Sequence, residues 1–167
     1  MTATPSPQTD FDPTLDLRLD RLIHASPARV WRCWTEPELL KQWFAPKPVE
    51  TIEAVLDPRP GGRFFTVMRI PEMGDMPGEG CLLVAEPDRR LVWTNTMHTG
   101  FRPVTLDAPG SFAFTVEITL APENEGCRYS ATVRHADAAG CKTHADMGFE
   151  GGWGTAAKQM EALAQTL

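Results

Sequence analysis

Apolar and polar side chains alternate along much of the chain from residue 15 to residue 135, and a period of two predicts β-strands. The predicted strands span residues 15–23, 49–56, 63–70, 81–86, 91–97, 111–120 and 127–135. Residues 71–80 hold two prolines and three glycines, and this composition is typical of a loop. Strands that follow one another through short turns form an antiparallel sheet with one buried face, so we expect that architecture here.

Helical spacing replaces the alternation in two places. In the run VWRCWTEPELLKQWFAP at residues 30–46, apolar side chains recur three and four positions apart, which predicts two short helices joined at Pro37. Ser26 and Pro27 suit the cap and the first turn of the first helix. The last 25 or so residues also follow helical spacing and predict one long terminal helix. Three of the five tryptophans lie in residues 30–46, so we expect aromatic helices that cover a sheet and enclose a cavity.

The division of the chain into parts is simple. Residues 1–13 are rich in Pro, Thr, Ser and Asp, which predicts a disordered tail. Residues 14–167 show no repeat and no linker, so we expect a single domain.

Charge and cysteine content narrow the functional classes. The net charge of −6, with scattered Lys and Arg, disfavours nucleic acid and an anionic membrane surface as partners. The start of the chain lacks the basic and apolar segments of a signal peptide, and no stretch resembles a spanning helix. The four cysteines form no CxxC pair, which favours reduced thiols in a cytoplasmic protein. Phosphate-binding and dinucleotide-binding motifs are absent, so we expect no cofactor.

Several separated motifs resemble one family. They are VWRCWTEPELLKQWFAP, PGGRF, RRLVWT, TVEITLAPENEGCR and EGGWGTAAKQMEAL, and they occur in this order between residues 30 and 163. Together with the order of elements they resemble the START-like (SRPBCC) superfamily, and within it the homologues of the activator of HSP-90 ATPase. The resemblance implies an α+β helix-grip fold, in which a curved antiparallel sheet of about seven strands, two short helices and a long C-terminal helix surround a cavity.

Three features depart from the family pattern. Cys127 stands where members of the family that the chain resembles commonly have Thr. The run Gly151-Gly152-Trp153-Gly154 has more glycine than usual, which predicts a hinge or a close approach of the last helix to the sheet. Residues 98–110 form a longer connection than a plain hairpin needs, and loops of this length often act as lids.

The predicted inward faces carry aromatic and methionine side chains with few polar groups, which is the composition of a pocket for a small apolar molecule. We therefore expect a small hydrophobic or aromatic ligand in an internal cavity. The residues expected to contact it are Trp43, Phe64, Met68, Trp93, Met97, Phe112, Phe114, Met147 and Trp153.

Other functions stay open at this stage. An enzyme of the cyclase or hydratase kind would need an acid–base pair in the cavity, for which His98, Tyr129 and His135 are the available side chains. A chaperone cofactor is implied by the family name alone, and such cofactors use another domain for which this chain has no room. A partner-binding domain with a collapsed core and no ligand is a further open alternative, and a homodimer through sheet edges or the aromatic helices is another.

A metal site has weak support. Cys141, His144 and Asp146 have the spacing of metal ligands, but a structural site usually has four ligands in two pairs. We therefore expect no metal.

Overall fold

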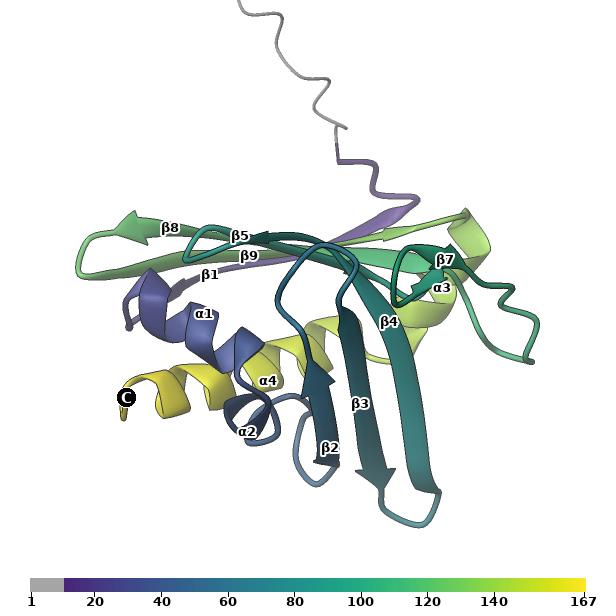
Figure 1. Ribbon diagram of the computed structural model, residues 1–167, viewed down its shortest axis with the longest axis horizontal. Helices are drawn as coiled ribbons and strands as arrows, with labels where there is room; N and C mark the ends of the chain where they lie inside the picture. Colours follow the sequence, from purple (N-terminus) through teal and green to yellow (C-terminus); the bar gives the residue numbers. More distant parts are fainter. Residues whose placement is uncertain (1–10) are drawn as a thin grey trace, which may run out of the picture.

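The computed structural model describes residues 11–167, which form nine strands and four helices (Figure 1). The strands are β1 (Asp16–Ile23), β2 (Glu50–Leu56), β3 (Arg63–Ile70), β4 (Gly74–Glu86), β5 (Arg90–Thr94), β6 (Met97–His98), β7 (Arg102–Pro103), β8 (Phe114–Glu123) and β9 (Gly126–His135). The helices are α1 (Pro27–Thr35), α2 (Pro37–Leu40), α3 (Ala138–Asp146) and α4 (Phe149–Ala164). Seven strands make one antiparallel sheet in the order β1-β9-β8-β5-β4-β3-β2, and β6 pairs with β7. The predicted α+β class and the seven-stranded antiparallel sheet are confirmed.

The main sheet is strongly curved. In Figure 1, β2, β3 and the first part of β4 descend from the layer formed by β1, β9, β8 and β5, and α1, α2 and α4 lie in the angle between the two parts. Alternation along β8 places Val116, Ile118 and Leu120 in the core beneath these helices. The helices therefore cover the concave face, where the core and any cavity must lie.

The two aromatic helices are held in place by local contacts. The side chain of Ser26 accepts a hydrogen bond from the backbone N–H of Arg29 at 3.3 Å, and Pro27 begins α1 as predicted. Trp34 of α1 is 1% exposed, and the indole Nε1–H of Trp43 donates to the carbonyl of Cys33 at 2.9 Å. This bond ties the segment after α2 back onto α1.

The prediction of a loop at residues 71–80 is wrong. Residues 74–80 belong to β4 and pair with β3 in regular register, with Met68 opposite Met76 and Thr66 opposite Gly78. Pro77 is tolerated because β5 pairs with β4 only from Cys81 onward, so this half of the strand has β3 alone as its neighbour among the described strands.

The predicted long C-terminal helix is confirmed as α4, and a separate helix that was not predicted, α3, precedes it. Gly148 has φ +89° and caps α4, so the chain turns there in a conformation that suits glycine. The glycine run at residues 151–154 lies inside α4 and makes no hinge. It does allow a close approach to the sheet, since a Cβ atom on Gly154 would lie 2.6 Å from Nη2 of Arg21 on β1.

The strand predicted at residues 91–97 ends earlier, at Thr94. The backbone N–H of Asn95 still donates to the carbonyl of Phe114 at 3.3 Å. The other bonds to this segment come from its side chain, whose amide donates to the carbonyl of Phe112 and whose oxygen accepts from the N–H of Phe114, both at 2.9 Å. The chain then leaves the sheet, and Met97 pairs with Pro103 in the small β6–β7 hairpin.

The predicted tail falls largely outside the described residues, which begin at residue 11. Within the described part, the N–H of Asp12 donates to Asp16 at 2.8 Å, and Phe11 lies 4.8 Å from the guanidinium of Arg18. No helix in this part of the chain is long and apolar enough to cross a membrane.

Candidate functional site

Two adjoining cavities occupy the angle between the curved sheet and the helices. The inner cavity has a volume of about 250 Å³ and lies beneath α4, whereas the outer cavity has about 570 Å³ and opens beside β3, β4 and the 98–106 segment. Five side chains line both cavities: Phe44, Met68, His144, Met147 and Trp153. The two spaces therefore meet along a common wall and form one candidate site.

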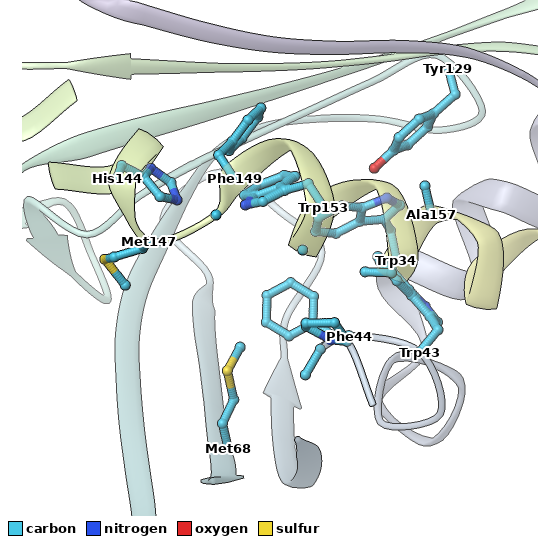
Figure 2. Close-up of a pocket in the computed structure, with 15 residues that line it drawn as sticks. Trp34, Trp43, Phe44, Met68, Tyr129, His144, Met147, Phe149, Trp153 and Ala157 are labelled. Carbon is cyan, nitrogen blue, oxygen red and sulfur yellow. The ribbon is translucent and has the colours of Figure 1, made fainter. Parts of the chain in front are cut away.

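The inner cavity is enclosed mostly by aromatic and aliphatic side chains (Figure 2). Trp34 and Trp43 pack edge to face with ring centroids 4.9 Å apart. Tyr129, His144 and the indole N–H groups of the tryptophans supply the polar side-chain groups of this wall, and the N–H of Trp34 is buried without a hydrogen-bond partner among the described residues. Figure 2 shows the hydroxyl oxygen of Tyr129 directed toward the cavity. Burial raises the pKa of Tyr129, so the phenol stays protonated at neutral pH.

The outer cavity continues the aromatic lining. Phe64 and Trp93 stack with centroids 4.2 Å apart and planes 5° from parallel, and Phe114 meets Trp93 edge to face at 5.5 Å. His98 and residues 104–106 of the long insert also line this cavity, so the expected lid segment forms part of its wall. The charged side chain in this lining is Glu79, which is paired with Arg63 at 2.9 Å.

A histidine at the junction of the cavities, His144, is bonded to a second histidine behind it, His135. Nε2 of His135 lies 2.9 Å from Nδ1 of His144, and Nδ1 of His135 lies 2.8 Å from the carbonyl oxygen of Leu15. Burial, together with the neighbouring His135, lowers the pKa of His144 from 6.5 to about 4. His144 is therefore neutral at physiological pH.

The structure places most of the predicted ligand-contacting residues around this site. Trp43 lines the inner cavity, Met68, Met147 and Trp153 line both, and Phe64, Trp93, Phe112 and Phe114 line the outer one. Met97 is the exception, because the end of β5 at Thr94 carries it into the β6–β7 hairpin and away from both linings. The role of these residues in binding stays a prediction.

The three side chains considered for acid–base chemistry are not brought together. His98 lines the outer cavity, Tyr129 lines the inner one, and His135 lies behind His144 rather than in either lining. No hydrogen bond joins any two of these three within residues 11–167.

Sequence reasoning missed the position of His144 and considered it only as a metal ligand. The signal was weak because α3 carries few apolar residues, and Gly140 and Cys141 are its buried positions. Phe149 was also missed, since the break at Gly148 that orients it was not foreseen.

The suspected metal ligands on α3 separate in space. His144 bonds to His135, and Asp146 pairs with Lys142 on the surface of the same helix. Among the residues that the structure describes, no group of three or more His, Cys, Asp or Glu side chains is arranged to hold a metal ion.

Comparisons with known proteins agree with the fold. A family model described as Activator of Hsp90 ATPase homolog 1-like protein matches residues 24–165. Protein NE0264 from Nitrosomonas europaea is 41% identical, with a TM-score of 0.87 over 93% of this chain and 97% of that one. Protein Ms6760 from Mycobacterium smegmatis is 26% identical, with a TM-score of 0.73 over 94% and 96% of the two chains.

A third structure extends the likeness at the level of the fold alone. An AHSA1-like protein from Aeromonas hydrophila is 17% identical and reaches a TM-score of 0.66 over 91% of this chain and 93% of that one. No curated protein matches the sequence. The helix-grip fold expected from the motifs is confirmed by these similarities.

Proposed function

The chain belongs to the family of Activator of Hsp90 ATPase homolog 1-like proteins, and from this premise we propose that it binds a small hydrophobic or aromatic molecule in the joined cavities. The fold is that of a ligand-binding domain in general. The observation that carries the finer proposal is the common wall of Phe44, Met68, His144, Met147 and Trp153, because it joins two apolar spaces into one site.

Size and chemistry support this ligand class. The outer cavity, at about 570 Å³, falls in the range of small-molecule sites, and the inner cavity, at about 250 Å³, lies just below that range. Burying apolar surface of a ligand contributes about 25 cal/mol per Å², so an aromatic body is favoured over a polar one. Met68 and Met147 adapt their shape readily, which suits contact with a ligand that differs from the protein's own core.

The opening of the site also supports entry from solvent. Met147 is 72% exposed and Met76 is 51% exposed, and both line the outer cavity. Large exposed apolar side chains at the edge of a cavity are typical of a ligand entrance.

Titration with N-phenyl-1-naphthylamine, an uncharged apolar fluorophore, tests the proposal. We expect saturable binding of one molecule per chain, with a rise in fluorescence that an excess of a non-fluorescent apolar competitor reverses. Fluorescence that grows linearly with dye concentration and resists competition would show that the cavities do not take such molecules.

We also infer a reducing, cytoplasmic location. The cysteines of the described chain, Cys33, Cys81, Cys127 and Cys141, are free and buried. Burial raises the pKa of the Cys33 thiol to about 11. Thiols kept in this state suit a compartment in which disulfides do not form.

A further inference from the structure

We infer that the ligand carries a hydroxyl group on its apolar body and that this hydroxyl donates a hydrogen bond to Nε2 of His144. The inference rests on the proposed ligand-binding function and names the chemical class of the ligand. It is carried by the hydrogen-bond chain from Leu15 through His135 to His144.

The first link fixes the position of a proton on His135. The carbonyl oxygen of Leu15 accepts from the backbone N–H of His135 at 3.0 Å and lies 2.8 Å from Nδ1 of the same residue. A carbonyl oxygen cannot donate, so Nδ1 of His135 must carry the hydrogen.

The second link follows from the first. His135 is 7% exposed and has no carboxylate partner among the described residues, so a charge on its ring would be buried and unpaired. Its neutral ring then has a bare Nε2, which acts as an acceptor. The partner 2.9 Å away, Nδ1 of His144, must therefore be the donor.

The third link directs a lone pair into the site. A neutral His144 with its hydrogen on Nδ1 has a bare Nε2, and within residues 11–167 that atom has no hydrogen-bond partner. The ring lines both cavities and is surrounded by aromatic rings, with the centroid of Phe112 at 5.1 Å and that of Phe149 at 5.4 Å. This nitrogen is not among the fully buried side-chain atoms without a partner in the described residues, so a molecule in the cavities can reach it. An accessible acceptor in apolar surroundings favours a ligand that brings a donor.

The charges around the cavities restrict the ligand further. Neither lining contains Lys or Arg, and the charged side chain present is Glu79. An anionic ligand would find no counter-ion and would face a lone pair at His144. A neutral hydroxyl compound is therefore favoured over a carboxylate or a phosphate.

The test compares 2-naphthol with naphthalene, which differ by one hydroxyl group on the same ring system. For the wild-type protein and for His144→Phe, the ratio of the two dissociation constants is measured by calorimetry. We expect the substitution to reduce the preference for 2-naphthol over naphthalene about tenfold, and this ratio cancels any change that the larger phenyl ring makes to the affinity for both compounds. 2-Methoxynaphthalene, which cannot donate, should behave as naphthalene does.

The outcomes separate the two proposals. If both compounds bind and the ratio is the same in His144→Phe, the hydroxyl inference is wrong while the cavity proposal stands. If neither compound binds the wild-type protein, the cavity proposal fails and the inference fails with it.

A spectroscopic measurement on the wild-type protein covers the case in which the variant does not fold. In a long-range proton–nitrogen NMR spectrum at neutral pH, we expect Nδ1 of His144 to be protonated and Nε2 to be bare. Addition of 2-naphthol, but not of naphthalene, should shift the Nε2 signal. A protonated Nε2 in the free protein would overturn the inference.

His135 acts here as a positioning residue, since it contacts neither lining. His135→Phe removes the acceptor that holds the hydrogen on Nδ1 of His144. We expect this variant to keep its naphthalene affinity and to show Nε2 of His144 protonated in a measurable fraction of molecules. An unchanged tautomer would contradict this role of His135.

Discussion

Gly152 offers a way to fill the inner cavity with little disturbance of the protein. It lies in α4 and lines the cavity, and a Cβ atom built on it would meet only Cγ of Pro46, at 3.8 Å. Gly151, the preceding residue of the same helix, is exposed, and a Cβ atom there would meet nothing within 4 Å. Gly152→Leu and Gly151→Leu therefore form a matched pair in which only the first side chain enters the site.

The expected magnitudes follow from this geometry. Either leucine should stabilise α4 by about 0.7 kcal/mol through helix propensity, which raises Tm by about 2 °C. Leucine at Gly152 adds four carbon atoms, which at about 30 Å³ per water-sized group occupy roughly 100 Å³. The cavity that receives them has a volume of about 250 Å³. Its preferred rotamers point toward the helix N-terminus, where Met147 and Gly148 line the same space.

The leucine at Gly152 should gain a further 1.5–3 kcal/mol, roughly, from burial in the inner cavity. A ligand that must share the space meets an overpacking cost of about 1–3 kcal/mol, which weakens its binding about 5-fold to 150-fold. The assay combines thermal unfolding with N-phenyl-1-naphthylamine titration of both variants. Equal dye affinity in the two variants would refute the location of the site, and a destabilised Gly152→Leu would refute the empty space beneath α4.

Three further predictions concern stability and reactivity. The pKa of His144 falls from 6.5 to about 4 on folding, so between these values the unfolded chain binds a proton that the folded chain does not, and the free energy of unfolding should fall as the pH drops. After allowance for the partial exposure of the ring, we expect a decrease of about 1–2 kcal/mol between pH 7 and pH 4.5, measured by urea denaturation. His144→Phe should show a smaller pH dependence. Gly126→Ala should destabilise the protein by about 2 kcal/mol or more, because its Cβ would lie 2.3 Å from the carbonyl oxygen of Ile23. The control Gly151→Ala should be neutral or stabilising, and equal Tm values for the two variants would contradict the close contact at Gly126. Native protein at pH 8 should react slowly with Ellman's reagent, because burial raises the pKa of Cys33 to about 11 and the other thiols are also buried. All four thiols should react in denaturant. A fast-reacting thiol in the native protein would contradict the buried positions.

The parts of the fold that were predictable are those in which local pattern and tertiary packing agree. The alternation at residues 111–120 matches the inward face of β8, although the strand begins only at Phe114. Before that point the side chain of Asn95, rather than a backbone ladder, bonds to the carbonyl of Phe112. The helical spacing at residues 30–46 matches α1 and α2, and Trp34 and Trp43 pack as the spacing predicts.

The first half of β4 escaped prediction for a physical reason. Proline and glycine disfavour strands in general, but a strand segment with one neighbour can hold Pro77 without loss of a ladder hydrogen bond. Such tolerance depends on which strands lie alongside, and that information is tertiary.

The candidate site was predictable in composition but not in its polar centre. Aromatic and methionine residues on inward faces pointed to the cavity, and the structure places eight of the nine predicted residues in its walls. The pairing of His135 with His144 joins β9 to α3 across a turn, and α3 itself has no clear apolar period. Its position therefore emerged only from the assembled fold.

Native mass spectrometry of the freshly purified protein, followed by denaturing extraction, tests the central claim most directly. The account predicts a co-purifying neutral apolar molecule, one per chain, in the wild-type protein and in Gly151→Leu, and its loss in Gly152→Leu. A bound molecule that persists equally in Gly152→Leu would contradict the account, as would a wild-type protein that is empty and stays empty after incubation with N-phenyl-1-naphthylamine.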